Sequence, residues 1–313
     1  MALSASSISK QAGAAISSRL IPPKVGSSIW QVTGTRPGRH VVVIGGTHGD
    51  ERTGIEVVKT LQPMFANEEK MLEKGKLTLV LGNEEAIRLV KRGTTTEHNL
   101  NRLFTEEHLA GPVLDYYESR RAHELAPILA TADISIDIHS TSTPSMPFLP
   151  NLYSPRHEKV YRWFNTDIVL ADPDFILAAR RSTTDEYVES FGGIGICFET
   201  GYEKDTSTRA TVTESVLNIL MDQGLLKAPR PVKPPRKKYK VFQFTKRIIL
   251  TKAGFRYAGE FPASFQEVKK GEVIGYHGTV PEVAEEDGAI VLQKAPAKWV
   301  VGHDIFFLAR RVK

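Results

Sequence analysis

The chain has 313 residues, enough for one large domain and a smaller one. Hydrophobic residues make up 41% and charged residues 25%, a balance typical of soluble globular proteins, and no apolar run is long enough for a membrane-spanning helix. The single cysteine, Cys197, excludes an intrachain disulfide and favours a reducing compartment, so a cytoplasmic protein is expected.

The formal net charge of +5 comes from one segment of the chain. Residues 227–240 contain seven Lys/Arg and no acidic residue, and removing these cations takes the net charge from +5 to −2. Four prolines in the same segment indicate a stiff, extended and solvated linker. We therefore expect neither a nucleic acid nor a membrane as a partner; a polyanion-binding patch is the alternative interpretation of this segment.

Residues 1–26 differ in composition from the rest of the chain. They are rich in Ser and Ala, carry Lys10, Arg19 and Lys24, and contain no acidic residue. This composition predicts a disordered extension, and the alternative is a targeting segment for the mitochondrion or another organelle.

Strand and helix patterns alternate from residue 27 to residue 226. Apolar residues alternate or run continuously in short segments that predict strands, whereas three longer segments have them at helical spacing. This order favours an α/β fold with a mostly parallel or mixed sheet and helices on both faces. The predicted strands are 27–34, 40–44, 76–83, 132–139, 167–172 and 193–200, and the predicted helices are 52–65, 116–130 and 208–226.

After the proline-rich segment the pattern changes. Short alternating runs separated by turn residues fill the tail, and no strong helix pattern appears there. The predicted organisation is therefore an extension (1–26), an α/β domain (27–226), a basic linker (227–236) and a small β-rich domain (237–313).

Imidazoles and carboxylates follow three of the predicted strands. His48 and Glu51 come just after strand 40–44, His139 ends strand 132–139, and Glu199 lies at the end of strand 193–200. Ligands of parallel α/β sheets bind at the carboxyl ends of strands. Two histidines, one carboxylate and a water form a common catalytic zinc site, which also needs a proton acceptor such as Glu199. Asp137 precedes His139 on the same strand face, where it can orient the imidazole.

Each of these residues also has a structural interpretation. An H-x-x-E pair occurs by chance in many chains, His139 is compatible with a buried core histidine, and Glu199 with a capping residue. The stretch "GGTHGDERTG" lacks the Lys-Ser/Thr of a phosphate-binding loop. The residues alone leave the metal site and the structural role both open.

Four motifs in order narrow the choice. "GGTHGDE" (45–51), "NLNR" (99–102), "DIHST" (137–141) and "CFETG" (197–201) resemble the aspartoacylase/succinylglutamate desuccinylase family of the zinc carboxypeptidase superfamily. The resemblance covers roughly residues 28–226 and extends more loosely into the tail. It implies a carboxypeptidase-like domain with one Zn²⁺ per chain, held by His48, Glu51 and His139, and Glu199 as the general base.

The resemblance also implies how a substrate is held. Asn101 and Arg102 match a pair that binds the substrate carboxylate, for which the planar fork of Arg is well suited. Arg92 is the match for an arginine that polarises the scissile carbonyl, with Arg88 and Lys91 as alternatives. Ser140 and Thr141, next to His139, are further candidates for substrate contacts.

Departures from the family pattern bear on the substrate. Asn99 stands where the motif usually has Asp, and no tyrosine matches the family's substrate-contacting one near Lys298 and Trp299. A second substrate-binding arginine of aspartoacylase corresponds to Glu189, and the nearest arginines are Arg180 and Arg181. If that loop is equivalent, Glu189 disfavours a dicarboxylate substrate.

These observations together predict a zinc-dependent hydrolase that cleaves the amide bond of a small N-acyl amino acid. The alternatives are a zinc carboxypeptidase acting on short peptides and a catalytically inactive metal-binding module. A tail that covers His48 would favour the small substrate. Assembly into a homo-oligomer is compatible with the sequence.

Overall fold

The computed structural model describes residues 27–66, 72–178, 180–229, 231–234 and 236–313. The predicted extension 1–26 lies outside the described residues. In the described part, no helix is both long and apolar enough to cross a membrane.

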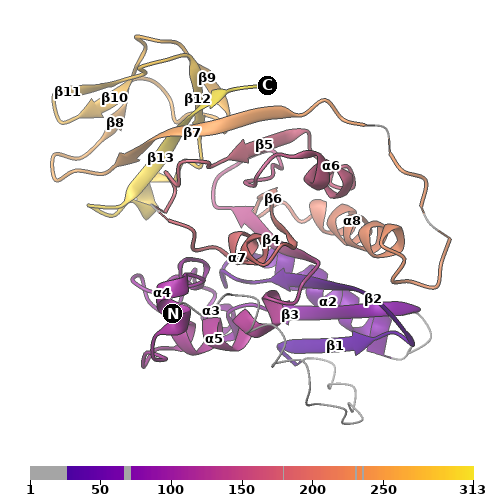
Figure 1. The fold of residues 1–313 in the computed structure, drawn as a ribbon. Helices are drawn as coiled ribbons and strands as arrows, with labels where there is room; N and C mark the ends of the chain where they lie inside the picture. Colours follow the sequence, from indigo (N-terminus) through magenta and orange to yellow (C-terminus); the bar gives the residue numbers. More distant parts are fainter. Residues whose placement is uncertain (1–26, 67–71, 179, 230, 235) are drawn as a thin grey trace, which may run out of the picture.

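A five-stranded mixed sheet forms the centre of the first part of the chain (Figure 1). Its order is β1-β3-β2-β4-β6, with β1 antiparallel to β3 and the other neighbours parallel. This confirms the predicted α/β fold. The strands are β1 (Ile29–Thr33), β2 (Arg36–Gly45), β3 (Lys74–Leu81), β4 (Ile134–Thr141) and β6 (Ile194–Tyr202).

Helices cover both faces of this sheet because its strands are apolar on both sides. Val41 and Val43 of β2 pack into a core with α2 (Arg52–Ala66) and α8 (Thr208–Asp222). Val42 and Ile44 point the other way, into a core with α5 (Tyr117–Leu129) and α7 (Thr184–Ser190). Successive residues of a strand face opposite sides, so this continuous apolar run is buried on both. The remaining helices are α3 (Glu84–Leu89), η1 (Leu100–Arg102), α4 (Glu106–Ala110) and α6 (Pro155–Tyr161).

The tail is β-rich, as the sequence predicts. The structure places only one short 3-10 helix, η2 (Pro296–Lys298), in residues 240–313. A second sheet has the order β5-β7-β13-β12-β9, and a three-stranded sheet has the order β11-β10-β8. The strands are β7 (Lys240–Ile249), β8 (Arg256–Tyr257), β9 (Gln266–Val268), β10 (Val273–His277), β11 (Val280–Val283), β12 (Gly288–Val291) and β13 (Asp304–Arg311).

Strand β5 (Ile168–Ala171) has an unexpected partner. It pairs in parallel with β7 and so belongs to the second sheet, not to the central one. Figure 1 shows β5 lying beneath β7. The two parts of the chain are therefore joined through backbone hydrogen bonds as well as through the linker.

Glycines allow α2 to begin directly against the end of β2. Gly46 has a φ of +75°, a left-handed conformation that suits glycine. A Cβ on Gly45 would clash with the backbone of Gly54, in the first turn of α2. This close packing keeps the loop short, and the loop carries His48 and Glu51 at the carboxyl edge of the sheet.

A buried histidine in β2 predicts that the stability of the fold is sensitive to acid. His40 Nε2 lies 2.9 Å from Thr78 Oγ1 and its Nδ1 lies 3.1 Å from Thr131 Oγ1. Burial and the nearby charge of Lys76 lower the pKa of His40 from 6.5 to about 4. The folded protein therefore binds fewer protons at this site than the unfolded chain. Its contribution to stability is complete above pH 6.5 and is lost as the pH falls towards 4.

We expect His40→Gln to remove much of this acid sensitivity. The wild-type free energy of unfolding should fall by about 3 kcal/mol more than that of the variant between pH 7 and pH 4. Urea unfolding at the two pH values measures this difference. The same change at the exposed His303 is the control, and equal acid sensitivity in wild type and His40→Gln would contradict the assignment.

Candidate active site

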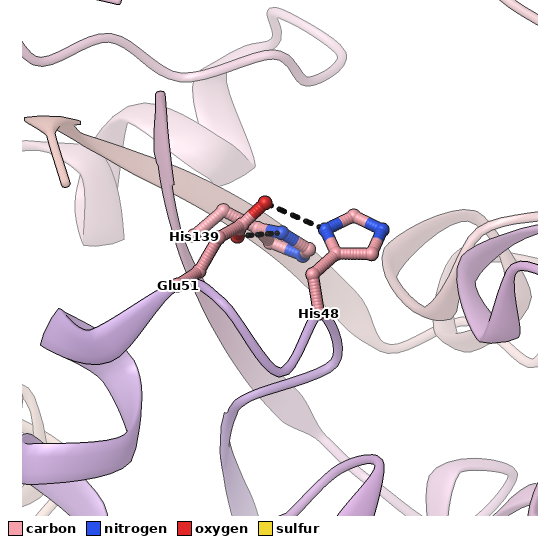
Figure 2. Close-up of side chains that lie close together, drawn as sticks. All are labelled: His48, Glu51 and His139. Atoms are coloured by element: carbon pink, nitrogen blue, oxygen red, sulfur yellow. Dashed lines mark hydrogen bonds and ion pairs between the residues drawn. The ribbon is translucent and has the colours of Figure 1, made fainter. Parts of the chain in front are cut away.

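Three side chains from two elements meet at the carboxyl edge of the central sheet. His48 and Glu51 come from the loop between β2 and α2, and His139 comes from β4. All three are buried, and one ligand atom of each lies within 4.8 Å of the others. Figure 2 shows both imidazoles directed at the carboxylate of Glu51. His48 Nδ1 lies 2.7 Å from Glu51 Oε1, and His139 Nδ1 lies 2.8 Å from Glu51 Oε2.

The outer nitrogen of each imidazole faces an oxygen. His48 Nε2 lies 3.1 Å from Asn99 Oδ1, which also accepts a hydrogen bond from the amide of Asn101. His139 Nε2 lies 3.2 Å from Asp137 Oδ2, close enough for an ion pair but without the geometry of a hydrogen bond. Oxygens at these positions favour a proton on Nε2, and each Nδ1 donates a hydrogen bond to Glu51 at the place where a metal ion would take over from the proton. Two nitrogens and one carboxylate presented in this way fit a catalytic zinc ion with an open position.

Asp137 is itself held in place. Its carboxylate accepts hydrogen bonds from Thr47 at 2.8 Å and from Thr184 at 2.6 Å. Burial opposes its charge, but His139 and these hydroxyls keep the pKa of Asp137 below its usual value. An ionised Asp137 can therefore orient His139. Neither threonine could be identified from the sequence: Thr184 lies outside the four motifs, and Thr47, although within "GGTHGDE", is not a metal-ligand residue type.

The pKa of Glu51 is also low. Burial would raise it, but the two imidazoles hold the pKa of Glu51 well below its usual range. The amide of Ser140 lies 3.2 Å from Glu51 Oε2, and Arg92 Nη1 lies 3.2 Å from Glu51 Oε1. Glu51 is thus charged, as a metal ligand must be.

Glu199 is the register partner of His139 on the neighbouring parallel strand β6, so the two side chains share a face of the sheet. Its Oε2 is buried with no hydrogen-bond partner among the described residues. Burial and the negative charge of Glu51 raise the pKa of Glu199 to about 7. A carboxyl group with this pKa can take up and release a proton near neutral pH.

Arg92 and Arg102 bring positive charge to the same edge. The Arg92 side chain is 56% exposed and reaches Glu51, whereas Arg88 pairs with Glu85 on the surface. Burial and the charge of Arg92 lower the pKa of Arg102. The geometry therefore places Arg92, rather than Arg88, beside the metal-ligand group, which consists of His48, Glu51 and His139.

Some polar groups of the other predicted substrate-binding residues already form hydrogen bonds within the protein. Asn101 is buried on η1, and its Oδ1 accepts a hydrogen bond from the amide of Thr184. Thr141 Oγ1 donates to the carbonyl of Thr143, whereas Ser140 Oγ is buried without a partner in the described part of the chain. Of these hydroxyls, only that of Ser140 has its hydrogen-bonding capacity unused.

The prediction that Glu189 bears on substrate choice is wrong. Glu189 lies in α7 and binds Arg156, His157 and the amide of Gly195. Gly195 is at the amino end of β6, so Glu189 lies at the opposite end of the sheet from His139. Arg180 does not reach the site either, since it pairs with Glu107 on the surface. The charge of Glu189 therefore says nothing about the substrate.

The β-rich tail approaches the metal-ligand loop. Lys298 Nζ lies 3.9 Å from Oδ2 of Asp50, a residue that stands between His48 and Glu51 in the sequence. Thr143, after β4, donates a hydrogen bond to the carbonyl of Gln293. Asp304 of β13 is among the charges that act on Arg102. The tail thus forms part of the rim of the site.

The fold agrees with the comparisons to known proteins. Residues 37–220 match the model of the succinylglutamate desuccinylase/aspartoacylase catalytic domain. That match spans more than half of the chain, and the protein belongs to this family. The structure of succinylglutamate desuccinylase from Vibrio parahaemolyticus aligns with a TM-score of 0.70 and 18% identity, covering 91% of this chain and 86% of that one. At this identity the likeness concerns the fold.

Curated relatives match over a shorter segment. A probable aspartoacylase from Nostoc sp. is 38% identical over 109 residues, which are 33% of this chain and 35% of the relative. An N-acyl-aromatic-L-amino acid amidohydrolase (carboxylate-forming) from Danio rerio is 32% identical over 111 residues, 33% of each chain. The matched segment thus spans about a third of these relatives.

Proposed function

We propose that this protein is a zinc-dependent hydrolase that cleaves the amide bond of an N-acyl amino acid. The observation that carries the proposal is the buried group of His48, Glu51 and His139, with Nδ1 of both imidazoles directed at the carboxylate. Membership of a family whose relatives are named as aspartoacylases and N-acyl amino acid amidohydrolases supports the substrate class.

His48, Glu51 and His139 would hold one zinc ion. When bound, zinc supplies Lewis acidity that polarises the amide carbonyl and makes water a stronger acid. Glu199 takes the proton from the attacking water and delivers it to the nitrogen of the leaving amino acid. The amide C–N bond breaks, and the products are a carboxylate and a free amino acid. The pKa of about 7 suits Glu199 to both transfers.

Four further residues bind the substrate in this proposal. Arg92 donates hydrogen bonds to the carbonyl oxygen as negative charge develops on it. Arg102 binds the carboxylate of the amino acid through its planar guanidinium, and Asn101 and Ser140 complete that pocket. Asp137 keeps His139 oriented. Thr141 remains a candidate for a contact through its backbone.

The position of the tail favours small substrates over peptides. Lys298 next to Asp50 and Gln293 next to Thr143 put the β-rich part of the chain at the rim of the site. A peptide chain extending beyond the scissile bond would have to pass this rim. We propose that the protein acts in the cytoplasm, and the alternative is the mitochondrion or another organelle.

A panel of substrates tests the proposed function. N-acetyl and N-succinyl derivatives of acidic, aromatic and basic amino acids are incubated with the zinc-loaded protein, and release of the free amino acid is measured beside that from tripeptides. We expect the acyl amino acids to have the higher kcat/KM and chelation to abolish hydrolysis. Faster cleavage of tripeptides, or full activity without metal, would contradict the proposal.

Arg92→Gln should lower kcat by about 100- to 1,000-fold, because it removes a donor to the developing oxyanion. Zinc content and melting temperature should change little, since more than half of the side chain is exposed. Steady-state kinetics and metal analysis measure both effects. Arg88→Gln is the control from the same segment, and an equal loss of kcat in that variant would remove Arg92 from its role.

A further inference from the structure

A cavity lies at the opposite end of the central sheet from the candidate active site. Its volume is about 360 Å³, and its walls include Ile194, the first residue of β6. Ile194 and Glu199 are five positions apart, which corresponds to roughly 16 Å along a strand. The cavity is therefore separate from the metal-ligand group.

Cationic side chains dominate the walls of this cavity. They come from β2, from α6 and the residue that follows it, and from the basic linker, whereas a single carboxylate, that of Asp222, faces them. The cations are Arg39, Arg156, Lys159, Arg162 and Lys233.

Two of the five cations already have partners. Lys233 Nζ lies 3.4 Å from Asp222 Oδ1. Arg156 binds Glu189 and the carbonyls of Gly192 and Gly193. These contacts hold the linker and α6 against the α/β part of the chain. They also pair the carboxylates of Asp222 and Glu189.

The other three cations have no anionic partner among the described residues. Arg39 and Lys159 are exposed and make no ion pair or side-chain hydrogen bond within the described part. Arg162 lines the cavity, and its Nε is buried without a hydrogen-bond acceptor. Like charges gathered around one cavity repel each other, and a buried guanidinium N–H without an acceptor is unfavourable. A bound anion would relieve both.

From this geometry we propose that the cavity binds a small phosphate-bearing anion. A guanidinium can bind two phosphate oxygens at once, and lysine adds a point charge. The volume is at the lower end of the range of small-molecule pockets, about 300–1,000 Å³, so the ligand is compact. A nucleic acid would need a longer basic stripe along the surface. Lys233 at the rim gives the basic linker a role in the site.

Titration calorimetry of the metal-loaded full chain with inorganic pyrophosphate tests this proposal, with the metal content measured before and after. One saturable site is expected. Lys159→Gln and Arg162→Gln should each weaken binding by about tenfold or more. Lys252→Gln, an exposed residue in the tail, removes the same charge and should leave binding unchanged. Because Lys159 is exposed, its substitution does not threaten the fold, whereas Arg162→Gln is checked by its melting temperature.

Three results would overturn the proposal. The first is the absence of saturable pyrophosphate binding. The second is binding that is unaffected by Lys159→Gln and Arg162→Gln, which would place the anion at the catalytic edge. The third is a general attraction of polyanions, shown either by an equal loss of pyrophosphate binding in Lys252→Gln or by affinity for oligonucleotides that increases with their length. Hydrolase activity of Lys159→Gln should equal that of the wild type, so that this test stands apart from the proposed function.

Discussion

Glu199→Gln should lower kcat by about 100- to 10,000-fold while leaving the zinc content unchanged. The amide has nearly the shape of the carboxyl group but cannot accept the proton of the attacking water. Glu199 is not one of the three residues that converge as metal ligands, so its loss should not release the ion. Metal analysis together with steady-state kinetics separates the two effects.

The pH profile gives the same assignment a second readout. Because the pKa of Glu199 is raised to about 7, the general base is protonated in acid and ionised in alkali. Bound zinc adds positive charge beside Glu199 and lowers this pKa, so the wild-type kcat/KM should rise with pH and reach its plateau below pH 7. Glu203→Gln, four residues further along the chain, is the matched control and should keep both the rate and the profile. A Glu199→Gln variant with normal kcat would remove this residue from the mechanism.

His139→Ala should abolish stoichiometric zinc binding and with it hydrolysis. Removing a residue that hydrogen-bonds to a metal ligand typically lowers metal affinity by roughly 10- to 100-fold, and removing the ligand itself should lower it further. The same substitution at Asn99, which faces His48 Nε2, should show the smaller effect. Competition with a chelator measures both affinities. A His139→Ala protein that retains one zinc per chain would contradict the ligand assignment.

Much of the central sheet could be predicted from the sequence because its signals are local. The run Val41–Ile44 is buried on both faces, and the spacing of apolar residues in α2 and α8 gives each helix one inward side. The partner of β5 was not predictable in this way. Its four apolar residues suit either sheet, and the pairing with β7 joins segments about seventy residues apart.

In the candidate site, too, residues with local sequence signals could be predicted, whereas residues whose roles depend on packing could not. His48, Glu51, His139 and Glu199 stand at strand ends, where the alternation of strands and helices already indicates a shared edge. Asp137 could be predicted to orient His139 because it lies two residues before it on the same strand, whereas the other groups around the two imidazoles are harder to predict. Asn99 caps the start of η1, and Thr184 reaches Asp137 from α7, so their roles depend on how separate elements pack. Glu189 was misplaced because distance along the chain from Glu199 does not determine at which end of β6 a residue lies.

The pairing of β5 with β7 has a consequence for how this chain can be divided. A protein that ended after α8 would expose the backbone amides and carbonyls of β5 that now bind β7, and an open strand edge invites pairing with other chains. The α/β part is thus not self-contained, although a linker follows it. Gene fusion or exchange at the proline-rich segment would separate β5 from β7, so we expect the two parts to fold as one unit.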